Sequence, residues 1–140
     1  MHLHRPEYAC AILCAPGKAL LLELRDATSR HAPDQLTCFG GHREPGEQAA
    51  HCLRRELDEE IGWQPARLHR ALDLVRGQRW IARFYQAAFT ATLQDLTILP
   101  GRQARLVSLD ALATAPVSRW HRAALNGWLK GHTRIDIDHA

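Results

Sequence analysis

The pattern of apolar and polar positions divides the chain into short strands and two amphipathic helices. Short apolar or alternating runs bounded by turn residues predict strands over residues 8–14, 19–25, 36–39, 68–76, 79–92 and 105–109. Apolar residues at spacings of three and four predict helices over residues 47–61 and 118–131, with a short helical turn over 109–113. Strands mixed with two helices favour a sheet covered on both faces, which is an α/β architecture.

The helix predicted over residues 47–61 has a clear end and one apolar face. Gly62 follows it as a left-handed cap, and Pro65 lies just beyond. The stripe that we expect to be buried consists of Ala50, Leu53, Leu57 and Ile61.

A neighbouring stripe of the same helix is acidic. Glu56, Glu59 and Glu60 come together there, because spacings of three and four place helix side chains side by side. Like charges so placed cost roughly a few tenths of a kcal/mol per pair, and the helix dipole disfavours negative charge in the last turn. Breaking two local rules at once is typical of functional sites. Clustered carboxylates favour Mg²⁺ or Mn²⁺ over zinc, and a solvated acidic face is the alternative interpretation.

Residues 41–63 resemble the Nudix box, G-x5-E-x7-R-E-U-x-E-E-x-G-U, where U is a bulky apolar residue. The matching positions are Gly41, Glu47, Arg55, Glu56, Leu57, Glu59, Glu60 and Gly62. Trp63 stands where Ile, Leu or Val is usual, and it keeps the bulk and apolar character of that position. So many fixed residues at the right spacing make the motif highly specific.

The resemblance implies a fold and a chemistry. The fold is the Nudix fold, an α/β/α sandwich with a mixed β-sheet. The chemistry is hydrolysis of a diphosphate bond with Mg²⁺ or Mn²⁺ as cofactor. The chain has 140 residues and 46% hydrophobic composition, which suits a single Nudix domain over residues 1–140 and leaves no room for an added DNA-binding domain.

The resemblance also implies the metal ligands. Glu56, Glu59 and Glu60 are expected to bind the metal, and the backbone carbonyl of Gly41 or of Gly40 is expected to add a ligand. Glu56 and Glu59 are the expected catalytic glutamates, with Glu56 the candidate general base.

Arg55 completes the expected catalytic group. It would orient Glu47 or Glu56 through charge-assisted hydrogen bonds, and a surface salt bridge is the alternative. Many family members use a further acid downstream of the long strand, and Gln103 stands roughly where that acid is expected. The number of metals and the identity of the base therefore stay open.

Substrate-binding residues have weaker signals. Arg43 and Arg79 are candidate phosphate contacts, and Phe39 is a candidate to stack on a base. A solvated face explains either arginine equally well, and strand aromatics are core residues more often than ligands. Arg25, Arg83, Trp80, Phe84 and Tyr85 are further candidates of the same two kinds.

Charge narrows the class of partner. The formal net charge is +3, with 18 basic and 15 acidic residues, and five of the acids lie within residues 47–60. The remaining surface is therefore more positive than the total suggests, which suits a polyphosphate substrate. No dense basic stripe is present, which counts against nucleic-acid binding.

The cysteines show no C-x-x-C pair, so we expect buried free thiols. Zinc binding by Cys38, His42, His51 and Cys52 is the alternative, although this spacing matches no standard zinc motif.

Three features bear on location and order. The longest apolar run, 19–22, is too short to span a membrane, and residues 1–7 lack the apolar core of a signal peptide. We therefore expect a cytoplasmic protein that does not interact with membranes. The tail over residues 132–140 is expected to be poorly ordered.

The sequence thus predicts a metal-dependent enzyme acting on a small nucleotide, with a nucleoside triphosphate handled in the MutT-like way as the favoured substrate. ADP-ribose, dinucleoside polyphosphates, nucleotide sugars and RNA 5′-ends remain alternatives, as does a Nudix module that binds nucleotide without catalysis. The oligomeric state is left open, a homodimer included.

Overall fold

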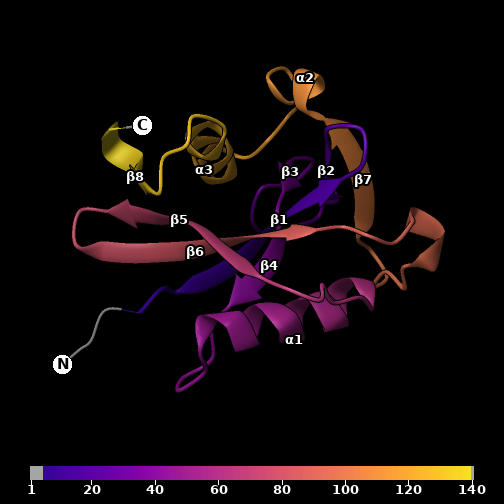
Figure 1. Ribbon diagram of the computed structural model, residues 1–140, viewed down its shortest axis with the longest axis horizontal. Coiled ribbons are helices and arrows are strands. Elements are labelled where there is room, and N and C mark those ends of the chain that lie inside the picture. The colour runs from indigo at the N-terminus through magenta and orange to yellow at the C-terminus, as the bar shows by residue number, and fades with distance from the viewer. Residues whose placement is uncertain (1–4, 140) are drawn as a thin grey trace.

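The computed structural model describes residues 5–139, which form a mixed β-sheet between helices on its two faces (Figure 1). Helix α1 (Ala49–Ile61) lies against one face, and α3 (Arg119–Leu129) lies against the other. The α/β/α arrangement predicted from the sequence is therefore confirmed. Residues 1–4 and residue 140 lie outside the described residues. The expectation that residues 1–7 are not a signal peptide falls partly on these residues.

Within the described residues the sheet has eight strands. They are β1 (Tyr8–Ala15), β2 (Ala19–Leu24), β3 (Leu36–Thr37), β4 (Phe39–His42), β5 (His69–Arg76), β6 (Arg79–Ala88), β7 (Gln103–Ser108) and β8 (Arg134–Asp136). Their order is β3-β2-β1-β6-β5-β8, with β4 also paired to β1 and β7 also paired to β2. The β1–β6 and β5–β8 pairs are parallel, and the other pairs are antiparallel.

Strand β1 is buried on both faces, which explains its nearly continuous apolar sequence. Ala9, Ala11 and Leu13 belong to the core beneath α1, whereas Cys10 and Ile12 belong to the core beneath α3. The residues that fix α1 to its core are Cys52, Leu53, Leu57 and Ile61. Both helices are therefore held by packing against the central strands.

Most predicted elements are present, with shifted boundaries. Helix α1 begins at Ala49, because Gln48 is extended and occupies the N-cap position, and it ends at Gly62 in the expected left-handed conformation. The strand predicted over 36–39 is divided between β3, which pairs with β2, and β4, which pairs with β1. The strand predicted over 79–92 ends at Ala88, and Thr92 instead caps the 3-10 turn η1 (Leu93–Asp95). The short helical turn is α2 (Leu109–Leu112).

The C-terminal segment corrects one expectation. Within the tail over 132–140 that we expected to be poorly ordered, β8 pairs with β5 and the 3-10 turn η2 (Ile137–His139) follows. Ile135 and Ile137 are buried in the core beneath α3, with exposed fractions of 8% and 4%. The prediction was wrong because these two apolar side chains anchor an otherwise polar segment.

Two further expectations concern thiols and membranes. Cys10, Cys38 and Cys52 are buried, Cys14 is half-buried, and all four are free thiols, as predicted. No helix within residues 5–139 combines the length and apolar character needed to cross a membrane.

Candidate active site

Two glycines of β4 lie where the strand passes α1. A side chain at Gly41 would overlap the carboxyl group of Glu56, so the backbone and this carboxylate approach closely only because the position is glycine. Gly40 has a φ of 149°, and a side chain there would overlap the backbone of Ala9 on β1. The glycine pair therefore allows the strand to lie between β1 and the acidic face of the helix.

Arg55 joins the loop before α1 to the acidic face. Its Nε and Nη2 donate to the two carboxylate oxygens of Glu47 at 2.8 and 3.0 Å, and its Nη1 donates to Glu56 Oε1 at 3.0 Å. A longer contact of 3.5 Å reaches Glu59. The Arg55 hydrogen bonds lower the pKa of Glu47 to about 2, so Glu47 stays charged. Arg55 thus contacts both glutamates that the sequence left as alternatives.

Glu60 is the most buried acid of the helix, with 3% of its surface exposed. Its Oε1 accepts from the Gly40 N–H at 3.2 Å, and its Oε2 accepts from Arg102 Nη1 at 2.8 Å. Burial raises the pKa of Glu60 to about 8, although the neighbouring Arg102 charge acts to lower it. The sequence placed this side chain on an open acidic stripe, whereas the fold turns it inward.

The other two box glutamates differ in exposure. The Glu56 side chain is 17% exposed and lines the cavity described below, whereas the Glu59 side chain is 57% exposed and does not. Burial raises the pKa of Glu56 above its ordinary value, against the effect of Arg55. Glu56 therefore combines access to the cavity with a carboxyl group that takes up a proton more readily than usual.

The donor groups here suit a hard divalent cation. Glu56 and Glu60 bring carboxylate oxygens to the cavity wall, and Gly41 has no side chain to block approach to its carbonyl. Within residues 5–139, no three Asp, Glu, His or Cys side chains converge as a ready-made metal site. Arg55 contacts only Oε1 of Glu56, whereas both oxygens of Glu60 accept hydrogen bonds, so a cation at Glu60 would compete with Arg102.

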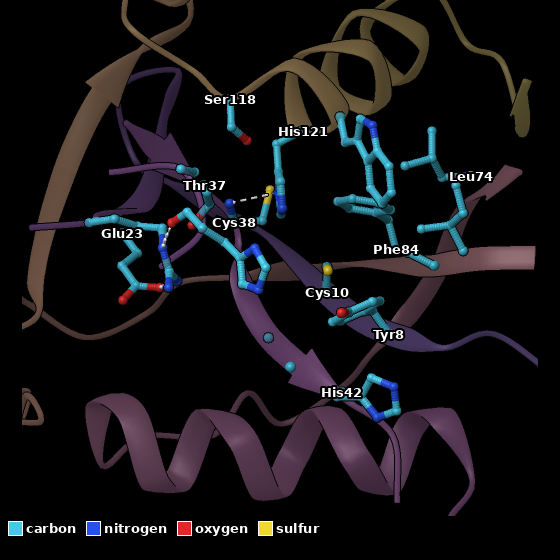
Figure 2. A pocket seen from close by; sticks show the side chains of 18 of the residues that line it. Tyr8, Cys10, Glu23, Thr37, Cys38, His42, Leu74, Phe84, Ser118 and His121 are labelled. Atoms are coloured by element: carbon cyan, nitrogen blue, oxygen red, sulfur yellow. Dashed lines mark hydrogen bonds and ion pairs between the residues drawn. The ribbon is translucent and has the colours of Figure 1, made fainter. Parts of the chain in front are cut away.

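A cavity of about 670 Å³ extends from β4 and α1 to the start of α3 (Figure 2). The side chains at the end near α1 include Glu56, Glu60 and His42. Tyr8 lies beside His42, with ring centroids 5.0 Å apart (Figure 2). The other aromatic and polar residues that complete the wall are Thr37, Phe84, Ser118, Trp120 and His121. The charged residues that line the cavity beyond α1 are Glu23, Arg25, Arg79, Arg102 and Arg119.

The end near α3 is organised by a neutral histidine. His121 Nδ1 accepts a hydrogen bond from the Cys38 N–H at 3.0 Å, drawn as a dashed line in Figure 2. Because Nδ1 is the acceptor, the ring proton lies on Nε2. Desolvation lowers the pKa of His121 to about 4, with a smaller contribution from Arg25. The His121 ring itself is therefore uncharged at neutral pH.

Comparison with known families agrees with this arrangement. The model of the NUDIX domain matches residues 4–126, which is most of the chain. The chain belongs to the Nudix family. It is accordingly a Nudix pyrophosphohydrolase, the enzyme class predicted from the box. No functionally curated protein matches the chain in sequence.

Solved Nudix structures share the fold at low sequence identity. The MutT protein from Methanosarcina mazei Go1 has a TM-score of 0.70 and 18% identity, covering 92% of this chain and 97% of that one. RenU, a Nudix hydrolase from M. smegmatis, has a TM-score of 0.66 and 23% identity, covering 92% and 85%. The NUDIX domain of Shewanella oneidensis NrtR, complexed with ADP ribose, has a TM-score of 0.70 and 13% identity, covering 92% and 88%.

Of the two arginines predicted to bind substrate, one lines the cavity of this Nudix domain. Arg79 does so while paired with Glu7, at 2.6 and 2.7 Å. Arg43 does not line the cavity, and its guanidinium donates to the backbone carbonyls of Pro6 and Glu47 at 2.9 Å each. Arg43 therefore holds the loop before α1 in place, and its predicted contact with phosphate is not supported by the geometry.

The prediction that Phe39 stacks on a substrate base is wrong. Phe39 exposes none of its surface and packs in the core beneath α1, on the opposite side of the sheet from the cavity aromatics. Because successive residues of an extended segment face opposite sides of the sheet, Phe39 faces the core beneath α1 and Cys38 faces the core beneath α3. The alternative zinc site does not form among the described residues, since Cys38 lies in the core beneath α3 and Cys52 in the core beneath α1, on opposite faces of the sheet.

Glu23, Arg102 and His121 are among the cavity residues that reasoning from the sequence missed. Glu23 lies inside the apolar run of β2, and a lone charge in a buried strand was a usable signal. Arg102 lies in an irregular loop, and His121 lies on the helix predicted from 118. Neither carries a local pattern that would connect it to the Nudix box.

Proposed function

We propose that this Nudix enzyme is a Mg²⁺- or Mn²⁺-dependent hydrolase that cleaves the diphosphate bond of a nucleoside diphosphate linked to another moiety. The favoured substrate is a small nucleotide such as a nucleoside triphosphate. Water attacks phosphorus and a phosphorylated product leaves. A cytoplasmic location remains part of this proposal.

The observation that carries the proposal is the continuity of the cavity. The same space of about 670 Å³ touches Glu56 and Glu60 at one end and the rings of Phe84 and Trp120 at the other. This volume is typical of a small-ligand pocket. A planar base fits against the aromatic end while its phosphates lie toward the acids. The cavity wall has four arginines and three glutamates, Arg25, Arg79, Arg102, Arg119, Glu23, Glu56 and Glu60, an excess of positive charge that favours a polyphosphate.

We assign the cation to Glu56, Glu59, Glu60 and the Gly41 carbonyl. When bound, it would supply charge neutralisation on the phosphate oxygens and make water a better nucleophile. Glu59 is exposed beside Glu56 and Glu60, so it can turn toward them without leaving a core.

The protein's own groups position the reactants. Glu56 is the proposed general base, because its carboxylate lines the cavity and burial brings its pKa closer to neutrality. Arg55 is a positioning residue: its guanidinium bridges Glu47 and Glu56 and so fixes the direction of the Glu56 carboxylate.

ADP-ribose is the second candidate substrate. The similar NUDIX domain of NrtR is described with ADP ribose bound, and this molecule contains the diphosphate bond that the proposal requires. Dinucleoside polyphosphates, nucleotide sugars and RNA 5′-ends share the same bond type and belong in the same test.

The test is a substrate screen with Mg²⁺ or Mn²⁺ over nucleoside triphosphates, ADP-ribose, dinucleoside polyphosphates, nucleotide sugars and a 5′-triphosphorylated RNA. We expect cleavage of the bond between two phosphates. Chelation of the cation should abolish this cleavage. Binding of a nucleotide without any product would instead establish a non-catalytic module.

Glu59→Gln gives the matched mutational test. We expect a loss of turnover of about a hundredfold or more, since a cation ligand is removed, with an unchanged melting temperature because the side chain is largely exposed. Asp58→Asn is the control, an identical chemical change at the adjacent, exposed helix position outside the box pattern. Full turnover by folded, metal-supplied Glu59→Gln would refute the assigned role.

A further inference from the structure

Arg102 bridges two buried acids beside the proposed metal site. Its Nη1 lies 2.7 Å from Glu23 Oε2 and 2.8 Å from Glu60 Oε2. The side chains of both acids are 4% exposed, whereas that of Arg102 is 29% exposed and lines the cavity. One guanidinium nitrogen is therefore shared between carboxylates that come from β2 and α1.

The loop that carries Arg102 is fastened to the end of α1. The Thr97 and Leu99 N–H groups donate to the carbonyls of Ile61 and Glu60, each at 3.0 Å, and the Arg102 N–H donates to Leu99 at 3.1 Å. The loop then enters β7, which pairs with β2. Arg102 is thus held at a fixed place between the two acids by backbone contacts on both sides.

The arrangement leaves part of the guanidinium unused. Within residues 5–139, Nε and Nη2 of Arg102 donate no hydrogen bond, while Nη1 serves both acids. A guanidinium carries five N–H donors, so Arg102 keeps donors beyond those that the two acids accept. Here the remaining donors belong to a side chain at the cavity wall, where a phosphate group would accept them.

Arg102 and a cation would compete for Glu60. Both of its oxygens already accept hydrogen bonds, one from Gly40 and one from Arg102. A divalent cation at Glu60 would also repel the guanidinium charge. Glu23 is a second carboxylate that pairs with Arg102, and it is not one of the expected metal ligands. Arg25 also pairs with Glu23, at 3.6 Å.

We propose that Arg102 is a phosphate-binding residue whose ion pair with Glu60 competes with a cation for that carboxylate. Once a cation takes Glu60, Arg102 is retained by Glu23 alone and donates to the substrate's diphosphate. The inference rests on the proposed function for the identity of the substrate. It adds a residue outside the Nudix box that links metal loading to phosphate binding.

Arg102→Gln tests both parts of the proposal, the competition with a cation and the contact with phosphate, in binding assays that need no turnover. The first measurement is calorimetric titration of the nucleotide-free protein with Mg²⁺ at pH 9, where protons compete little for Glu60. We expect binding to be tighter by about tenfold or more, because the internal competitor is gone. The second measurement is binding of inorganic pyrophosphate at saturating Mg²⁺, which should weaken by about tenfold or more.

Arg105→Gln is the matched control, an exposed arginine of β7 that bonds Gln103 and does not line the cavity. It should bind Mg²⁺ and pyrophosphate as the wild type does. Arg102→Lys keeps the positive charge between the acids and so protects the fold. It should show the same two changes at smaller size, since an ammonium lacks the planar set of donors.

Opposite signs in the two assays for Arg102→Gln, repeated at smaller size in Arg102→Lys, support the proposal, and any other pattern overturns it. A residue that acts only through its positive charge would show neither change in Arg102→Lys. A residue that only holds the structure together would weaken both bindings or neither. If the signs are opposite and the wild type hydrolyses no nucleotide, the proposed function fails and the role of Arg102 stands. If the wild type hydrolyses nucleotides and Arg102→Gln matches it in both assays, only the role of Arg102 falls.

Discussion

Gly41 is the residue on which the acidic site most directly depends. The carboxyl group of Glu56 occupies the space that any side chain at Gly41 would need, so strand and helix meet at van der Waals distance there. The backbone of Gly41 lies outside the left-handed region. Glycine is therefore needed at this position for steric rather than conformational reasons.

Gly41→Ala should therefore damage activity more than stability. The added methyl group must displace the Glu56 carboxylate, and a displacement of about 1 Å at a catalytic group costs about a hundredfold in rate. The measurement is turnover together with the melting temperature. Wild-type turnover in a folded Gly41→Ala protein would show that the position of Glu56 is unimportant.

Gly127→Ala provides the contrast for the same substitution. A methyl group there would overlap the end of the Ile135 side chain, and neither Gly127 nor Ile135 lines the cavity. The melting temperature should fall while turnover per folded molecule stays the same. The two glycines thus separate a steric effect on the site from a steric effect on the core.

The contacts of Arg55 with Glu47 and Glu56 could be predicted from the sequence because they follow from spacing within one short segment. Arg55 reaches Glu56 on the same helix and Glu47 in the preceding loop, so all three lie within one local motif. Arg102 reaches Glu60 and Glu23 from 42 and 79 residues away. Contacts across such separations depend on the order of strands, which no local pattern encodes.

At the scale of elements, the start of α3 is bound to the β3–β4 segment. The Ser118 N–H donates to Leu36 at 3.0 Å, the Leu36 N–H donates to Pro116 at 2.8 Å, and Cys38 donates to His121. The last of these bonds needs an unprotonated Nδ1. Docking of α3, and with it one wall of the cavity, is therefore sensitive to acid.

His121 should make the fold less stable as pH falls. Its pKa is about 4 in the folded protein and about 6.5 in the unfolded chain, so the unfolded chain binds the extra proton between these values. The contribution is fully present above pH 6.5 and is lost as pH falls toward 4. Between pH 7 and 4.5 the wild type should lose about 2 kcal/mol more unfolding free energy than His121→Asn. Urea unfolding at the two pH values measures this, and equal losses would contradict it.

The C-terminal tail shows where element prediction from the sequence ends. The short β8 segment has mostly polar neighbours, and its order comes from Ile135 and Ile137 entering the core beneath α3. Helix α1, by contrast, was predictable because its apolar stripe and its Gly62 cap lie within one continuous segment. Strand β1 was predictable for the same reason, since burial on both faces leaves a continuous apolar run.

At the scale of the molecule, the two cores place the acids and the aromatics around one cavity. The core beneath α1 fixes the helix that carries the box, and the core beneath α3 supports the wall that contains Phe84 and Trp120. The sandwich could be predicted from the box and the order of elements. The cavity could not, because its wall is drawn from six strands and both long helices.

A structure of the protein with Mn²⁺ and a non-hydrolysable nucleoside triphosphate analogue tests the central claim most directly. We predict anomalous scattering from manganese beside Glu56 and Glu60, phosphates between the cation and Arg102, and the base against the aromatic end of the cavity. Glutamates without manganese at saturating cation, with the nucleotide outside the cavity, would contradict the account.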